Sequence, residues 1–169
     1  MSVFDELLEA WRYSRDGVIA ELENLPESRL HELPAGVQRS ALDLANHIVE
    51  SGWLMAGELS RRDGDFQRKP YPDLIAELNP DRPATTRAEA IAVLHRSFDQ
   101  GIALLRAAGE DLMLQPIRQF NGVPAARLTW MHHGIAHEEY HRGQLALYAR
   151  LLGVVPAITK LYESAPAAT

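Results

Sequence analysis

Four long segments with helical periodicity, separated by proline-rich connections, limit what this chain can fold into. They cover residues 2–25, 40–61, 86–109 and 129–152. The first three repeat apolar residues at intervals of three or four, and the last repeats histidines at intervals of four. Such spacing gathers these side chains on one face of a helix, and an apolar face must be buried against another element. Helices of about 20 residues with this pattern predict an all-α fold, a four-helix bundle.

The expected helix ends carry capping and stop signals. Ser2 and Asp5 have the spacing of a capping box, and so do Thr86 and Glu89. Pro26 ends the first helix because proline has no N–H to continue the hydrogen-bond ladder, and a glycine at position 109 is placed to end the third.

The connections predict how the helices are joined. Residues 62–85 contain prolines at 70, 72, 80 and 83, which exclude a continuous helix, although residues 72–78 suit one or two helical turns. Asn121 and Gly122 stand between apolar residues, which is typical of a tight turn and of a small hairpin before the fourth helix. We expect two helical hairpins joined by a long crossover between the second and third helices.

Length and composition narrow the class of protein. We assign residues 1–163 to a single domain and residues 164–169 to a frayed tail. Cysteine is absent, which excludes disulfides, thiolate ligands and a cysteine nucleophile. The net charge of −6 and the scattered arginines argue against a nucleic-acid partner. No apolar run reaches the roughly 20 residues of a membrane span, and the acidic start lacks signal-peptide features, so we expect a cytoplasmic protein without a membrane partner.

Three histidines at intervals of four, His133, His137 and His141, form the most informative motif. A helix advances about 100° per residue, so their rings rise on one face of the fourth helix. His47 takes an inward position on the second helix. Two histidines four apart and one more from a facing helix supply three nitrogen ligands and leave metal positions open, as in a reactive metal site. His133 also suits a packing or pocket role.

Other side chains near this face are candidates for supporting roles. Trp130, Gln144 and Tyr148 share the arc of the histidines, where they would orient the imidazole rings or line a pocket. Glu50 and Glu138 are candidates for proton transfer, but no catalytic residue can be assigned.

A second arc of the fourth helix carries small or apolar residues, Ala136, Gly143 and Leu147. Glycine in the middle of a helix costs about 1 kcal/mol relative to alanine. We therefore expect another helix to approach closely at Gly143, either within the bundle or from a second subunit.

The run from His133 through His141-Arg-Gly-Gln144 and on to Gly153, with His47-Ile in an earlier helix, resembles the DinB/YfiT-like superfamily of metalloenzymes. The likeness spans nearly the whole chain. It implies a DinB-like four-helix bundle with a crossover after the second helix, frequent homodimers, and a divalent metal, most often nickel or zinc. Matched position by position, the metal ligands would be His47, His137 and His141.

Superfamily members of known activity include transferases and isomerases that use a low-molecular-weight thiol such as mycothiol, bacillithiol or glutathione. We therefore expect an enzyme of this kind, acting on a small-molecule substrate in a pocket shaped by residues 62–85 and 115–125. Nothing in the sequence singles out one thiol. Because histidine must be neutral to bind a metal, metal affinity should fall as the pH drops through about 6.5.

Two alternative functions stay open at this point. The first is a hydrolase that uses a metal-bound hydroxide, with Glu50 or Glu138 as its base. The second is a non-catalytic, stress-related binding protein in which the histidines form a buried polar network.

Overall fold

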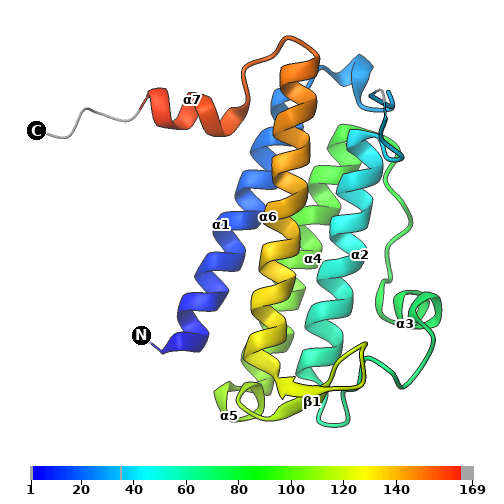
Figure 1. Ribbon diagram of the computed structural model, residues 1–169, viewed down its shortest axis with the longest axis vertical. Helices are drawn as coiled ribbons and strands as arrows, with labels where there is room; N and C mark the ends of the chain where they lie inside the picture. Colours follow the sequence, from blue (N-terminus) through cyan, green and yellow to red (C-terminus); the bar gives the residue numbers. More distant parts are fainter. Residues whose placement is uncertain (1, 35, 165–169) are drawn as a thin grey trace, which may run out of the picture.

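The computed structural model describes residues 2–34 and 36–164. Four long helices run side by side along the long axis (Figure 1), which confirms the predicted bundle. They are α1 (Val3–Asn24), α2 (Ala41–Ser60), α4 (Arg87–Ala108) and α6 (Arg127–Leu151). The shorter elements are η1 (Glu27–Arg29), α3 (Tyr71–Leu78), α5 (Glu110–Met113), β1 (Pro116–Arg118), β2 (Pro124–Ala126) and α7 (Ala157–Glu163). Within the described part of the chain, no helix is both long enough and apolar enough to cross a membrane.

The order of the helices around the bundle differs from the expected pair of hairpins. Both α1 and α2 pack mainly against α4 and α6, so α1 and α2 lie diagonally opposite each other despite their short link. In Figure 1, α1 and α6 run upward while α2 and α4 run downward. The crossover after α2 returns along the bundle before α4 begins, which explains its length. As a result α2 and α6 are antiparallel neighbours.

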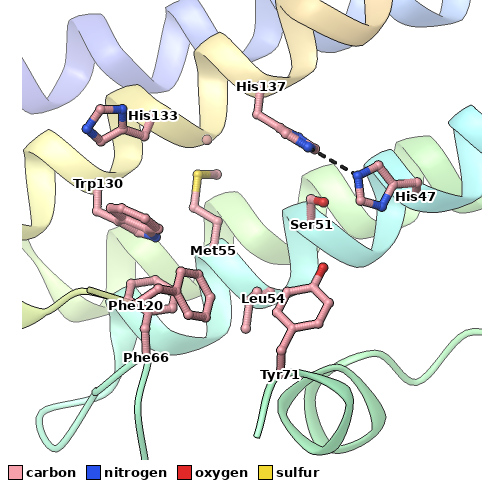
Figure 2. A pocket seen from close by; sticks show the side chains of 11 residues that line it. His47, Ser51, Leu54, Met55, Phe66, Tyr71, Phe120, Trp130, His133 and His137 are labelled. Carbon is pink, nitrogen blue, oxygen red and sulfur yellow. Dashed lines mark hydrogen bonds between the residues drawn. The ribbon is translucent and has the colours of Figure 1, made fainter. Parts of the chain in front are cut away.

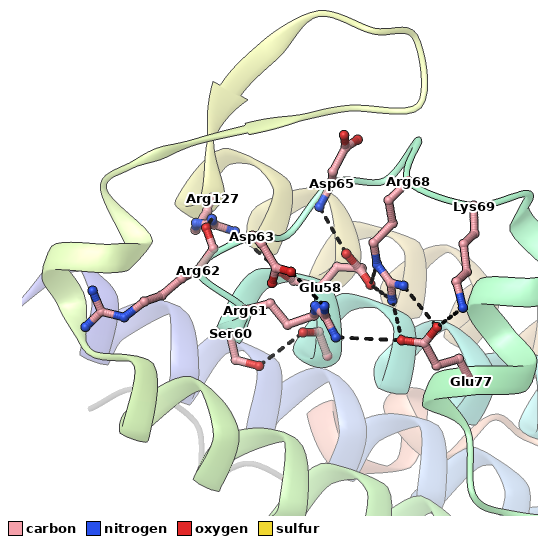
Figure 3. A network of polar contacts seen from close by, with 11 residues as sticks. Glu58, Ser60, Arg61, Arg62, Asp63, Asp65, Arg68, Lys69, Glu77 and Arg127 are labelled. Carbon is pink, nitrogen blue, oxygen red and sulfur yellow. Dashed lines mark hydrogen bonds and ion pairs between the residues drawn. The ribbon is translucent and has the colours of Figure 1, made fainter.

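Polar contacts hold the crossover against the end of α2 (Figure 3). The buried carboxylate of Glu58 accepts a hydrogen bond from Arg68 Nε at 2.8 Å and one from the Asp65 backbone N–H at 3.1 Å. Arg68 also pairs with Glu77 of α3 at 2.8 Å. These contacts fix the position of α3, which forms the helical turns expected near residues 72–78.

The helix ends follow the expected signals with one exception. Ser2 and Asp5 form both halves of a capping box. At the start of α4, Thr86 accepts from the Glu89 N–H, but the Glu89 carboxylate accepts from Thr85 rather than from the Thr86 N–H. That capping box is therefore only half formed.

The connections after α4 contain the predicted hairpin and two helices that periodicity did not indicate. Strands β1 and β2 pair antiparallel, and Gly122 takes a φ of 81° in the turn between them. The short α5 precedes the hairpin, and α7 follows α6 after Pro156. The buried carboxylate of Glu21 accepts hydrogen bonds from the first two N–H groups of α7, so a distant residue stabilises its start. Residues 165–169 of the expected tail lie outside the described residues.

The arc around Gly143 faces solvent in this chain. Nothing lies within 4 Å of the position that a Gly143 Cβ would occupy, and Leu147 is 48% exposed. Within the described residues, no helix of the bundle explains this glycine. A contact with a second copy of the chain, and hence the homodimer, stays a prediction.

A buried ion pair joins α6 to α1 in the middle of the bundle. Arg15 donates to the Glu138 carboxylate at 2.6 and 3.0 Å, and the Trp11 indole N–H donates to it at 2.6 Å. Arg15 also donates to Ser97 of α4 at 2.9 Å. All the charged atoms therefore have partners, which a buried ion pair requires if it is not to cost stability.

Replacing Glu138 by glutamine should leave Arg15 buried without its counterion. We expect Glu138→Gln to lower the free energy of unfolding by about 3–5 kcal/mol, measured by urea unfolding followed by circular dichroism. The matched control is Glu139→Gln, which removes the neighbouring carboxylate from a partly exposed pair with Arg142 and should cost about 1 kcal/mol or less. Equal losses in the two variants would contradict the assigned role of Glu138.

Candidate metal centre

Three histidine rings from two helices point their Nε2 atoms at one another. The Nε2 of His137 lies 3.2 Å from that of His47 and 3.0 Å from that of His141. One nitrogen from each ring lies within 4.8 Å of the other two. Because α2 and α6 are antiparallel neighbours, His47 stands level with the two histidines of α6. Figure 2 shows His47 and His137 facing each other across this seam.

The spacing of these nitrogens suits a divalent metal. Two ligands at 2.0–2.1 Å from a tetrahedral zinc ion stand about 3.3 Å apart, close to the separations from His137. A hydrogen bond from His141 to Gln144 also favours metal binding. The Gln144 Oε1 accepts it from the His141 Nδ1 at 2.6 Å. With Nδ1 protonated, the neutral His141 ring carries its lone pair on Nε2, where it faces the other two rings.

The Nδ1 atoms of His47 and His137, on the side of each ring away from the cluster, lack a hydrogen bond as short as that of His141. The His47 Nδ1 lies 3.9 Å from a Glu50 carboxylate oxygen, near enough to favour a proton on Nδ1 and a lone pair on Nε2. The His137 Nδ1 is buried and has no hydrogen-bond partner among the described residues. A buried polar atom without a hydrogen bond costs stability, and such atoms occur at functional sites.

Burial keeps the histidines neutral. It lowers the pKa of His47 and of His137 to about 4, with further lowering by the nearby Arg39 charge and by the neighbouring rings. Burial also lowers the pKa of His141, although the hydrogen bond to Gln144 opposes this. At neutral pH the cluster therefore offers uncharged nitrogens to a cation. The loss of metal affinity on acidification stays a prediction, and these lowered pKa values move the expected onset of proton competition below pH 6.5.

A pocket of about 330 Å³ opens beside the cluster, and His47 and His137 form part of its wall. Most of the remaining wall is aromatic or aliphatic (Figure 2). The aromatic side chains are Phe66 and Tyr71 of the crossover, Phe120 of the hairpin turn and Trp130 of α6. The crossover and the hairpin thus shape the pocket, in agreement with the expectation for these two segments.

Several pocket residues could not be identified from the sequence. Phe66 and Phe120 belong to irregular connections and Tyr71 begins the short α3, so no long periodic pattern indicated them and only the folded chain brings them together. Gly134 has a steric role here, because a Cβ at this position would lie 2.1 Å from the Met55 sulfur. A glycine in the histidine motif was the available signal for this close approach.

The residues expected to support the histidines have different roles in the structure: two line the pocket, one orients a histidine and one contacts the segment before α2. Trp130 and His133 line the pocket, where their ring centroids stand 5.4 Å apart, and His133 lies outside the three-nitrogen cluster. Gln144 orients His141, while the Tyr148 hydroxyl donates to the Arg39 carbonyl at 3.0 Å.

The suggested role of Glu138 in proton transfer is corrected. Its carboxylate is buried on the α1 side of α6 and is occupied by Arg15 and Trp11. Adjacent helix residues point about 100° apart, so the Glu138 side chain is turned from His137 toward the buried contact with α1. Glu50 stays near His47 but does not line the pocket.

Metal binding should depend on the clustered histidines and on Gln144. We expect Gln144→Leu to weaken zinc binding by about 10- to 100-fold, because the His141 tautomer is no longer held, and His137→Gln to weaken it further. His95→Gln, which changes an exposed histidine of α4, should bind zinc as the wild type does. Competition with a chelating indicator measures these affinities. Equal affinity of the wild type and His137→Gln would contradict the site.

The metal-free protein should lose stability as the pH falls from about 6.5 to about 4. In this window an unfolded histidine binds a proton, whereas His47 and His137 with a folded pKa of about 4 do not. The free energy of unfolding therefore rises with pH across the window. Urea unfolding with a chelator present should show this slope, and a His47→Gln/His137→Gln variant should show a smaller one. Identical slopes would be evidence against buried neutral rings.

Solved structures with similar folds include two proteins of Bacillus subtilis. The DinB-like protein YjoA is 18% identical, with a TM-score of 0.67 over 88% of this chain and 92% of that chain. YfiT, described as a probable metal-dependent hydrolase with an unusual four-helix bundle topology, is 12% identical, with a TM-score of 0.70 over 91% of each chain.

A mycothiol-dependent maleylpyruvate isomerase is also similar, at 13% identity and a TM-score of 0.64. The match covers 86% of this chain but 63% of the isomerase, so this chain spans less than two thirds of that enzyme. At these identities the likeness shows the fold alone.

No curated protein matches this sequence. The sequence model of the DinB family, in contrast, matches residues 1–168, nearly the whole chain. The four-helix bundle with its crossover and the histidine cluster between α2 and α6 agree with that match. The chain belongs to the DinB family.

Proposed function

We propose that this protein is a divalent-metal-dependent transferase or isomerase that uses a low-molecular-weight thiol. One observation carries the proposal: three neutral imidazole nitrogens converge at the wall of an apolar pocket. Three protein ligands leave coordination positions open for another molecule. Nickel or zinc suits this ligand set, since imidazole binds both.

The bound metal would supply a lowered pKa for a coordinated thiol, which makes the sulfur nucleophilic at neutral pH. The protein's own residues hold the rings in position and keep them uncharged. The aromatic wall formed by Phe66, Phe120 and Trp130 excludes water and holds the second substrate beside the histidines. Bringing the two reactants together in one orientation is a large part of such catalysis.

The pocket wall favours an uncharged aromatic or aliphatic substrate. Among the described residues that form it, none is an arginine, lysine, aspartate or glutamate. The polar groups beside His47 include the hydroxyls of Ser51 and Tyr71, which point into the pocket in Figure 2. Burial raises the pKa of Tyr71, so its hydroxyl keeps its proton and can donate to a substrate oxygen.

The same wall argues against the hydrolase alternative. A hydrolase that relies on a carboxylate base needs that group within hydrogen-bond reach of the attacking water. Glu138 is occupied elsewhere and Glu50 does not line the pocket. A thiol whose pKa is lowered by a metal needs no such base. The similar structures include both a mycothiol-dependent isomerase and a probable metal-dependent hydrolase, so the choice rests on the pocket wall.

A thiol panel tests the proposal directly. The zinc- or nickel-loaded protein is incubated with glutathione, bacillithiol or mycothiol and a chlorinated aromatic electrophile. The thiol sulfur bonds to the ring carbon, chloride leaves, and the thiol proton passes to solvent. We expect thioether formation, measured by mass spectrometry, to be lost in His137→Gln and kept in the control His95→Gln. No thiol consumption by the loaded protein, together with thiol-independent ester hydrolysis, would favour the hydrolase instead.

A further inference from the structure

A second hollow lies on the other side of the histidine cluster. It measures about 240 Å³ and is polar where the first pocket is apolar. Its wall includes Leu44 of α2 and Gln144 of α6, each about one helical turn beyond a clustered histidine. The three rings therefore stand between two hollows along the seam of α2 and α6.

Arg39 gives this second hollow a positive charge. The residue lies in the segment before α2, lines the hollow and is exposed. No carboxylate of the described residues lies within 4.0 Å of its guanidinium nitrogens. Arg39 shares the hollow with Leu44 and Gln144, which stand next to the cluster. Its positive charge adds to the effect of burial in lowering the pKa of the three clustered histidines. An arginine beside this cluster that makes no ion-pair contact with a carboxylate among the described residues is free to bind an anion.

Neighbouring groups hold this segment in place and add donors. The Tyr148 hydroxyl donates to the Arg39 carbonyl, so the backbone is tied to α6 while the side chain stays free of that contact. The side-chain amides of Gln38 and Gln144 line the same hollow. Amide donors and a guanidinium together suit a carboxylate, which accepts several hydrogen bonds.

We propose that the polar hollow binds a carboxylate group of the thiol co-substrate, with Arg39 as its anchor. This inference rests on the proposed function. The thiol lies along the seam, with its sulfur at the histidines and its carboxylate end about one helical turn away. The uncharged second substrate then approaches from the aromatic pocket on the opposite side. The protein should therefore prefer thiols that carry a carboxylate to thiols that carry none.

Binding measurements separate this proposal from turnover. Calorimetric titration of the zinc-loaded protein uses glutathione, S-methylglutathione, which cannot offer a free thiol, and glutathione diethyl ester, which lacks the carboxylate charges. We expect Arg39→Gln to weaken binding of the first two by about tenfold and to leave the ester unchanged. Arg39→Lys should recover part of the loss.

The control variant is Arg62→Gln, which removes one positive charge at the far end of α2 and should bind all three ligands normally. Equal glutathione affinity in the wild type and Arg39→Gln would overturn the anchor and leave the proposed function standing. Failure of the wild type to bind either glutathione or S-methylglutathione would overturn it as well. Arg39-dependent binding without any thiol turnover would support the hollow as a carboxylate site and contradict the proposed function instead.

Discussion

The buried contact of Glu138 with Arg15 and Trp11 decides how α6 is rotated in the bundle. A carboxylate with this burial must keep its partners, so this side of α6 faces α1. Because a helix turns about 100° per residue, His137 and His141 lie about 100° and 60° around α6 from Glu138, both displaced to the side that faces α2. His47 meets them there. The geometry of the histidine cluster thus depends on an ion pair that contributes no atom to it.

The seam between α2 and α6 has different chemistry on its two sides. Aromatic rings from the crossover and the hairpin lie on one side, and Arg39 with amide groups lies on the other. Uncharged nitrogens stand between them, kept neutral mainly by burial. This arrangement supports a reaction in which two dissimilar molecules meet, one apolar and one carrying a negative charge. The proposed function and the proposed carboxylate site both follow from this asymmetry.

Local signals in the sequence were sufficient for the four long helices and for placing the histidines of the last helix on one face. The capping box of Ser2 and the hairpin at Gly122 depend on neighbours within a few residues, and both are present. Local signals could not predict which helices are neighbours in the bundle. A short link between α1 and α2 suggested direct neighbours, yet both helices pack better against α4 and α6. No local signal in the sequence marks the start of α7 either, because its first N–H groups donate to Glu21 of α1 rather than to a nearby capping residue.

By itself the sequence determined that four helices form and that histidines four apart share one face of the last, because helical periodicity is a local property. It could not assign Glu138, since the partner that removes this carboxylate from the site comes from α1, more than a hundred residues earlier. The aromatic pocket and the hollow at Arg39 were likewise decided by tertiary structure. Their walls combine residues of α2 and α6 with residues of the connections, and only the packing of the folded chain places these on either side of the histidines.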